Sequence, residues 1–319
     1  MTTGVPLRIG TRASLLARTQ TGWVVERLRA HGVEVVVATI GTRGDERRDV
    51  PIAAIGGDGV FVRELEQALL DGRIDVAVHS LKDMPTAETA GLKLAGIPVR
   101  ATPFDALIGR TASRLEDLPA GARVGTSSIR RIVQLKAARP DVEAIPLRGN
   151  VDTRLRKLDA GDYDALILAA AGLERLGLGD RITHLLEPPA FWPAVAQGAL
   201  GVQVRAADAR ATDAVAAIDH GVTHAAAVAE RSMLGALAGG CLAPIGGWAR
   251  RGDHGGLTLG GCVLDVDPAT GVVSRIVAEE SAPPGTMGHQ AAALGEAVAQ
   301  RLLAAGAEAM LVRMRTRIA

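Results

Sequence analysis

The sequence contains few cysteines and few aromatic residues. It has two cysteines, Cys241 and Cys262, with no CxxC spacing, and this disfavours a disulfide framework or a zinc ribbon. Aromatic residues make up 2% of the 319 residues, so Val, Leu, Ile and Ala must fill most of the core. No window reaches about 18 uninterrupted apolar residues, and the N-terminus lacks the apolar core of a signal peptide. We therefore expect a soluble, cytoplasmic protein without a membrane partner.

A strong net charge is also lacking. The 36 Lys and Arg residues nearly balance the 35 Asp and Glu residues, which leaves a net charge of +1. A general nucleic-acid binder usually has an excess of basic residues and stacking aromatic side chains, so we expect no nucleic-acid partner. His220 and His224 are four residues apart, but no acid stands between them as in HExxH, and we predict no metal site.

Apolar, strand-like runs alternate with helical runs along the first two thirds of the chain. We predict strands over 33–40, 74–80, 122–128 and 164–172, and helices over 15–30, 61–72 and 129–139. This alternation predicts a mostly parallel sheet with helices on both faces, in two α/β units joined by the proline-containing segment 96–106. A helix over 223–241 capped by Thr223, a hairpin over 257–280 and a last amphipathic helix over 288–311 predict a smaller α+β domain.

One stretch departs from the even charge. Between Gly125 and Lys157 the chain carries six arginines and two lysines against three acids. Ser127 or Ser128 is expected to cap a helix whose first turn contains Arg130 and Arg131, where cations oppose the helix dipole. Local rules broken in this way often mark functional sites.

The same pattern recurs at the next predicted helix. Arg148 precedes a turn, Asn150 is expected to cap the helix, and Arg154 lies in its first turns. The plain alternative is a solvated basic face. Two helix starts with arginines at electrostatically poor positions favour an anion site for carboxylates or phosphates, because amides at a helix start and guanidinium groups both bind anions.

Ionisable residues also follow a predicted buried strand. The segment "IDVAVHSLKDMPT" places His79, Lys82 and Asp83 at the end of that strand, and ligands of open α/β sheets bind beyond the carboxyl ends of strands. A surface ion pair between Lys82 and Asp83 is the alternative. Arg12 and Ser14 follow another short strand and are expected to face the same cleft.

The two cysteines have different surroundings. Cys262 alternates within an apolar strand pattern and is expected in the core. Cys241 lies in "LAGGCLAPIGG", where the preceding glycines would let a bulky group approach the sulfur. A packed thiol is the alternative interpretation at either position.

Seven motifs in a fixed order resemble one family. They are "RIGTRAS", "HSLKDMPT", "GTSSIRR", "LRGNVDTRL", "AAAGLERLG", "PAVAQGALGV" and "GGCLAPIG", and they span nearly the whole chain. Each motif is weak alone, but the ordered set is highly specific and resembles porphobilinogen deaminases, which are also called hydroxymethylbilane synthases.

The resemblance implies a fold and an activity. The implied fold has two type II periplasmic-binding-protein-like domains with a cleft between them and a smaller third domain that carries the cofactor. The domains are expected over 1–99 with a return at about 200–217, over 104–193 and over 220–319. The implied enzyme is a monomeric transferase that joins four porphobilinogen molecules head to tail, releases ammonia at each step and yields hydroxymethylbilane for tetrapyrrole biosynthesis. Its implied cofactor is a dipyrromethane joined to Cys241 by a thioether.

The resemblance also implies roles for single residues. Asp83 is the expected catalytic carboxylate, which would stabilise positive charge on a pyrrole as ammonia leaves. The residues expected to hold the cofactor are Lys82, Asp83, Thr126, Ser128, Arg130, Arg131, Arg148 and Asn150. The residues expected to bind substrate are Arg12, Ser14, Arg148, Arg154, Arg175 and Gln197. The chain departs from many members at Asp58, where they have Lys, so contacts of the lid loop at about 43–59 are not carried over.

A binding protein of the same architecture that captures an anion without chemistry is the rival interpretation. A periplasmic binder would need a signal peptide, and it would have no use for Cys241 in a glycine-rich loop. A covalent dipyrromethane would add to the mass of the chain, so the intact mass distinguishes the two.

Overall fold

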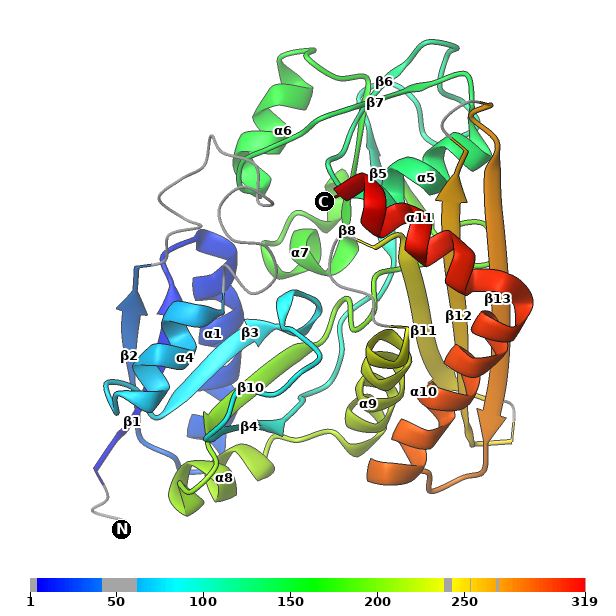
Figure 1. The fold of residues 1–319 in the computed structure, drawn as a ribbon. Helices are drawn as coiled ribbons and strands as arrows, with labels where there is room; N and C mark the ends of the chain where they lie inside the picture. The colour runs from blue at the N-terminus through cyan, green and yellow to red at the C-terminus, as the bar shows by residue number, and fades with distance from the viewer. Residues whose placement is uncertain (1–4, 42–61, 238–242, 253, 268–269, 319) are drawn as a thin grey trace. The chain divides into compact units, whose positions relative to one another are not determined.

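The chain folds into two compact units. The computed structural model describes residues 5–41, 62–237, 243–252, 254–267 and 270–318. The first unit comprises Met1–Ala101 and Ala199–His224, and the second comprises Thr102–Gly198 and Ala225–Ala319. The described residues form three sheets, one in the first unit and two in the second (Figure 1). The boundaries of three domains stay a prediction.

The first unit contains a mixed five-stranded sheet in the order β2-β1-β3-β10-β4. β1 pairs in parallel with β2 and β3, whereas β10 runs antiparallel to both β3 and β4. The strands are β1 (Leu7–Arg12), β2 (Val35–Ile40), β3 (Val76–Ser80), β4 (Leu92–Gly96) and β10 (Leu200–Arg205). The helices are α1 (Leu15–Ala30), α4 (Arg63–Leu70), α8 (Ala209–Ala216) and the 3-10 turn η1 (Leu81–Asp83).

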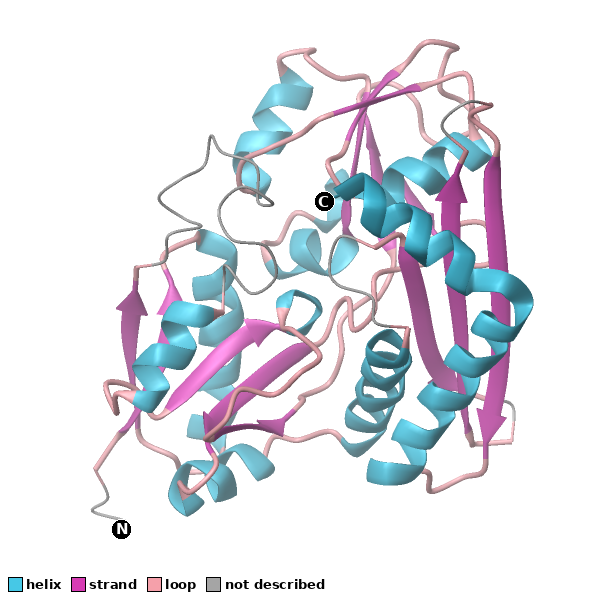
Figure 2. Cartoon of the chain, viewed as in Figure 1, coloured by secondary structure: helices cyan, strands magenta, loops and turns pink. Residues whose placement is uncertain are grey.

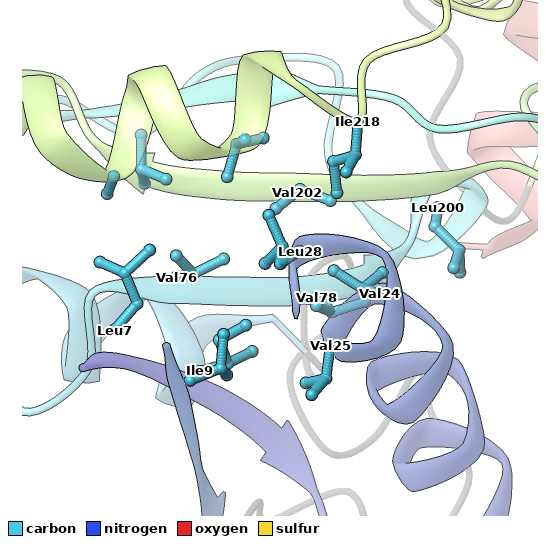
Figure 3. Close-up of a cluster of buried hydrophobic side chains, with 14 residues drawn as sticks. Leu7, Ile9, Val24, Val25, Leu28, Val76, Val78, Leu200, Val202 and Ile218 are labelled. Atoms are coloured by element: carbon cyan, nitrogen blue, oxygen red, sulfur yellow. The ribbon is translucent and has the colours of Figure 1, made fainter. Parts of the chain in front are cut away.

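Both faces of this sheet are covered by helices. Val76 and Val78 of β3 belong to a core cluster with Val24 and Leu28 of α1 (Figure 3). Ala77 points to the opposite face, where it packs with residues of α4. Because side chains alternate along a strand, a strand that is buried on both faces is apolar throughout. This explains why 74–80 could be predicted as a buried strand.

The second unit begins with a sheet of the same design, in the order β7-β6-β8-β5-β9. β6 pairs in parallel with β7 and β8, and β5 runs antiparallel to β8 and β9. The strands are β5 (Asp105–Gly109), β6 (Arg123–Gly125), β7 (Glu143–Ile145), β8 (Ala165–Ala169) and β9 (His184–Leu186). The helices are α5 (Ile129–Ala138), α6 (Val151–Asp159), α7 (Ala170–Arg175) and the 3-10 turn η2 (Gly179–Arg181).

The smaller sheet of the second unit is antiparallel and has the order β11-β12-β13. Cys262 of β12 faces a cluster with Val133 of α5 and Trp192. The neighbouring residue, Gly261, points to the opposite face of the sheet. That face packs against α9 and α10, because a Cβ on Gly261 would meet Met233 and Val298. The elements are β11 (Ile245–Arg251), β12 (Leu257–Val266), β13 (Val273–Ala282), α9 (Gly221–Ala236), α10 (Gly288–Leu302), the π-helical turn η3 (Leu303–Ala307) and α11 (Glu308–Ile318).

The fold class predicted from the sequence is confirmed, and so is the predicted hairpin, formed by β12 and β13 (Figure 2). Three details were wrong. Thr223 lies inside α9, and its backbone N–H donates to the His220 side chain instead. The last helix is interrupted at Gly306, which has a φ of 100° that glycine adopts without strain. The strand predicted over 164–172 ends at Ala169, where α7 begins. Among the described helices, none is both long and apolar enough to cross a membrane.

Candidate functional site

A buried carboxylate joins three of the predicted site residues. Asp105, the first residue of β5, is fully buried. Its Oδ2 accepts a hydrogen bond from Arg130 Nη1 at 2.7 Å, and its Oδ1 accepts from Arg131 Nη2 at 2.6 Å. Gln197 Nε2 also donates to Oδ1, at 2.9 Å. Arg130, Arg131 and Gln197 therefore meet at a carboxylate that the sequence analysis did not single out.

The charges of this cluster stabilise each other. Burial alone would raise the pKa of Asp105, but the charges of Arg130 and Arg131 outweigh burial and hold that pKa well below its usual range. Burial lowers the pKa of Arg130, and the charge of Asp105 opposes this shift. Two guanidinium charges face one carboxylate charge, so the trio keeps a net charge of +1.

Arg130 and Arg131 also bind backbone carbonyl groups of other segments, which fixes the start of α5. Arg130 Nη1 also donates to the backbone carbonyl of Trp192 at 2.5 Å, and Arg131 Nη1 donates to that of Ile167 at 2.9 Å. Gln134 accepts from the Trp192 backbone N–H and donates to its carbonyl. The buried Asp105 thus explains how two arginines are tolerated in a first turn where the helix dipole disfavours cations.

Arg154 lies in a different electrostatic environment. Arg154, in α6, donates from Nε to the carbonyl of Gly149 at 2.7 Å, and within the described ranges no carboxylate pairs with it. Burial and the charges of Arg131 and Arg148 lower the pKa of Arg154 to about 10. Arg131 and Arg148 therefore each lie close enough to Arg154 to repel its charge, and an anion bound beside Arg154 would relieve that repulsion.

The arginines at the two helix starts differ in solvent exposure. The side chains of Arg130 and Arg131 are 5% and 9% exposed, and each donates to Asp105 and to a backbone carbonyl. Arg148 and Arg154 are only half-buried. Of these four, Arg148 and Arg154 are accordingly the better placed to receive a ligand carboxylate.

The polar residues at the two helix starts have distinct positions. Asn150 caps α6, since its Oδ1 accepts from the Thr153 N–H at 3.1 Å, as predicted. Ser128 occupies the N-cap position of α5, but its side chain makes no capping hydrogen bond. Thr126 is buried, and its Oγ1 accepts from the Ser128 N–H. Ser127 instead binds the backbone of Leu147 through its hydroxyl, so it does not cap the helix.

Arg175 is the last residue of α7. Its Nη2 donates to the carbonyl of Gly198 at 2.7 Å, and burial lowers the pKa of Arg175 to about 10. Gln197, the residue before Gly198, donates to the carbonyl of Pro103 as well as to Asp105. The segment around 197–198 is therefore held at both residues by groups of the second unit.

In the first unit, Lys82 and Asp83 leave the end of β3 on the turn η1. Leu81 and Met84, on either side of them, are buried, and the Leu81 N–H donates to the carbonyl of Ala199 at 3.1 Å. Both side chains pack where Gly201 has none, because a Cβ there would lie 3.0 Å from Leu81 and 3.1 Å from Met84. The turn is thus anchored by its apolar residues, while Asp83 remains half-buried.

The end of β1 carries the other predicted residues of the first unit. Arg12 is its last residue, and Ser14 caps α1 by accepting from the Ala17 N–H at 3.3 Å. The charge of Arg12 reaches His79, where it adds to burial in lowering the pKa of His79 to about 4. His79 Nε2 lies 3.1 Å from Gln203 Oε1.

Some predictions fall where the structure gives no description. Cys241, Asp58 and the lid loop at about 43–59 lie outside the described residues. The other cysteine, Cys262, is fully buried in β12, and burial raises the pKa of its thiol to about 12. This agrees with the expectation that Cys262 is a core residue.

Asp105 is the site residue that the sequence analysis missed. Its signal was available, because "PFDALIG" places one acid at the start of an apolar strand, where an ionised side chain needs a buried partner. The partners lie 25 and 26 positions away, and pairing at that distance cannot be read from local pattern. Within the ranges that the structure describes, no group of three or more His, Cys, Asp or Glu side chains could hold a metal ion.

The arrangement is suited to a polycarboxylate. Arginine binds carboxylates through two parallel hydrogen bonds, and among the described residues no acid pairs with Arg154, whose pKa is lowered by burial and by Arg131 and Arg148.

Comparisons with known proteins cover almost the whole chain. One family model, described as "Porphobilinogen deaminase, dipyromethane cofactor binding domain", matches residues 7–213, and a second, "Porphobilinogen deaminase, C-terminal domain", matches residues 224–304. The porphobilinogen deaminase of Desulforudis audaxviator is 49% identical over 96% of this chain and 97% of its own. That of Roseiflexus castenholzii is 48% identical over 96% of this chain and 98% of its own. Among solved structures, a putative methionine-binding lipoprotein of Bacillus subtilis is 12% identical over 66% of this chain and 88% of its own, with a TM-score of 0.41.

Proposed function

The chain belongs to the porphobilinogen deaminase family, and from this premise we propose the reaction that it catalyses. It joins four porphobilinogen molecules head to tail, with loss of one ammonia per molecule, and water releases the product as hydroxymethylbilane for tetrapyrrole biosynthesis. The observation that carries the proposal is the match of both family models, which together cover residues 7–213 and 224–304.

The family's cofactor is a dipyrromethane, and the arginines of the second unit fit its carboxylates. Arg148 and Arg154 are half-buried, and the pKa of Arg154 is lowered by burial and by its neighbours Arg131 and Arg148. We propose that these residues hold the cofactor and the growing chain, with Thr126, Ser128, Asn150 and, from the first unit, Lys82 and Asp83. When bound, the dipyrromethane supplies the free pyrrole carbon at which the chain of rings is extended.

Arg130 and Arg131 are proposed to contribute to the cofactor site mainly by holding the protein backbone in place. Both are largely committed to Asp105 and to backbone carbonyls. Their main contribution is to fix the start of α5, where the N-cap residue Ser128 makes no side-chain capping hydrogen bond. Arg12, Ser14, Arg175 and Gln197 are proposed to bind substrate, as the family resemblance implies.

Cys241 is the proposed attachment point because the other thiol is unsuitable. The chain has two cysteines, and a thioether forms from the thiolate. Cys262 is fully buried in β12 with its pKa raised to about 12 by burial, so it is neither accessible nor ionised near neutral pH. A cofactor held by a cysteine of this chain is therefore expected on Cys241.

Asp83 is the proposed catalytic residue. Loss of ammonia from the aminomethyl group of porphobilinogen leaves an electron-poor carbon, and the new carbon–carbon bond forms there as a proton leaves the attacking ring. A fixed carboxylate stabilises the developing positive charge and can accept a pyrrole proton. Among the described residues, no side chain donates a hydrogen bond to Asp83, and its turn is anchored by Leu81 and Met84. This combination supports a preorganised carboxylate that is open to a ligand.

We also propose that the protein works as a cytoplasmic monomer on porphobilinogen alone. The even charge of the chain supports the absence of a nucleic-acid partner. Light scattering of the purified protein at working concentration tests the monomer, and a mass of two chains would contradict it.

The reaction is tested by incubating the purified chain with porphobilinogen and following ammonia and the linear tetrapyrrole together. The proposal predicts one ammonia per porphobilinogen consumed and one hydroxymethylbilane per four. Tight binding of porphobilinogen without ammonia release would instead identify a binding protein.

A further inference from the structure

A chain of hydrogen bonds, partly buried at Glu66 and fully buried at His79, runs through the first unit to the end of β3. His79 Nε2 lies 3.1 Å from Gln203 Oε1, and Gln203 Nε2 donates to Glu66 Oε1 at 2.9 Å. Thr89 donates to the other Glu66 oxygen at 2.9 Å. His79 and Gln203 are buried, and Glu66 is half-buried. These hydrogen bonds therefore connect β3, β10 and α4. They begin at His79, three residues before Lys82.

The directions of these hydrogen bonds follow from their chemistry. A carboxylate has no hydrogen to give, so the NH₂ group of Gln203 must face Glu66 and its oxygen must face His79. His79 Nε2 must then carry the hydrogen. Glu66 thus fixes the tautomer of an imidazole that it does not touch, and it leaves Nδ1 of a neutral His79 as an acceptor.

The surroundings also keep His79 uncharged. Among the described residues, the groups that face it are Gln203 from β10 and Arg12 from β1, with Glu66 of α4 behind Gln203. Burial and the charge of Arg12 both lower the pKa of His79, to about 4. A protonated ring would add a second positive charge beside Arg12, and the hydrogen bond with Gln203, which raises the pKa of His79, does not outweigh burial and that charge.

Within β3 itself, the polar side chains are His79 and Ser80, at the end that carries the proposed catalytic turn, and Asp75 just before the strand binds Arg8 and Arg205. Val76, Ala77 and Val78 are apolar and buried. On the opposite face from His79, Ser80 exchanges hydrogen bonds with Gln20 of α1 at 3.0 and 3.3 Å. Buried polar pairs of this kind specify one arrangement at a cost that apolar packing would avoid. His79 and Ser80 precede Asp83 by four and three residues, so their contacts fix the end of β3 from which the turn with Asp83 leaves.

We propose that His79 is a positioning residue of the reaction, held in the Nε2–H form by Gln203 and Glu66, so that the end of β3 presents Asp83 in one orientation. The proposal rests on the proposed role of Asp83. Since misplacement of a catalytic group by about 1 Å can cost on the order of 10²-fold in rate, loosening this chain lowers kcat while substrate binding elsewhere is retained.

The test uses Glu66→Gln in holoenzyme, with Thr89→Val as the matched control. The new amide at position 66 can both donate and accept a hydrogen bond. The side-chain amide of Gln203 is then free to exchange the positions of its oxygen and nitrogen, and His79 is free to change tautomer. Thr89→Val removes the other hydrogen bond of Glu66 but leaves the one to Gln203. Selective ¹⁵N labelling of histidine reports the tautomer, and His79→Phe identifies the signal. Intact mass reports cofactor loading in each variant.

Wild type is expected to show a neutral Nε2–H His79 at neutral pH. Glu66→Gln is expected to show both tautomers, a kcat lower by roughly tenfold to a hundredfold, an almost unchanged KM and full loading. Thr89→Val is expected to match wild type. A charged or Nδ1–H His79 in wild type, or a folded and loaded Glu66→Gln enzyme with normal kcat, would overturn the proposal. A wild-type chain without deaminase activity would instead refute the proposed function, so the two failures are distinct.

Discussion

Arg131 donates two hydrogen bonds to one oxygen of Asp105, from Nη2 at 2.6 Å and from Nε at 3.0 Å. The other carboxylate oxygen accepts from Arg130. One buried carboxylate therefore sets the position of two arginines in the first turn of α5.

Asp105→Asn is predicted to destabilise the protein strongly. It leaves two buried guanidinium charges without their carboxylate, and breaking a buried ion pair by removing one partner costs about 3–5 kcal/mol. Urea unfolding of the variant and of wild type measures the loss. Asp159→Asn is the control, because Asp159 pairs with Arg181 at 2.6 Å and both side chains are partly exposed, and surface pairs contribute about 0–1 kcal/mol. Equal losses in the two variants would show that Asp105 is an ordinary ion-pair partner.

Arg154→Leu is predicted to impair cofactor loading and elongation. A charge-assisted hydrogen bond to a ligand carboxylate contributes roughly 1.5–3 kcal/mol. Arg156 lies on the same helix and is exposed, so Arg156→Leu is the matched control and is expected to behave as wild type. Intact mass and single-turnover assays with porphobilinogen distinguish the two variants. Normal loading and elongation in Arg154→Leu would remove Arg154 from the site.

The low pKa of His79 predicts a loss of stability in acid. Its pKa falls from 6.5 to about 4 on folding, so between these values the unfolded chain binds a proton that the folded chain does not. Stability therefore falls as pH decreases through this window, by about 2 kcal/mol for this group between about pH 7 and about pH 5.

His79→Gln checks this prediction, since glutamine can donate to Gln203 but does not titrate in this range. Urea unfolding across the same pH range should show a shallower dependence in the variant than in wild type. An identical pH dependence in both proteins would mean that His79 does not change its pKa on folding.

Much of the fold could be predicted from local pattern. The helix predicted over 15–30 coincides with α1, and the apolar run before His79 marks β3, because amphipathic and buried periodicities are properties of neighbouring residues. The antiparallel strands β5 and β10 within otherwise parallel sheets were not predicted. Their direction depends on where the chain crosses between sheets, and no local pattern records that.

The site could be predicted in part for the same reason. Arg130, Arg131 and the Asn150 cap stand out because they occupy helix starts, where local electrostatics makes their positions unusual or favourable. Asp105 and Gln203 were missed because their importance comes from partners far away in sequence, Arg130 for the first and Glu66 for the second. Such pairings exist only once the sheets have formed.

Asp83→Asn is predicted to lower kcat by about 10²–10³, or about 3–4 kcal/mol, as for other preorganised electrostatic groups. The amide keeps the shape of the side chain but removes its charge, so folding should be little affected. Because the same step repeats for every ring, each addition should slow to a similar degree. The measurement is kcat on porphobilinogen with holoenzyme, alongside Tm. A folded, loaded variant within a factor of a few of wild type would reduce Asp83 to a structural residue.

The intact mass of the purified chain tests the central claim most directly. The account predicts the mass of the polypeptide plus one dipyrromethane in wild type, the same addition in Cys262→Ser, and the bare polypeptide with almost no activity in Cys241→Ser. Cys262 is fully buried, so its substitution by the similar serine tests the alternative thiol with little change in volume. An active wild-type chain with the bare mass, or an addition that maps to Cys262, would contradict the account.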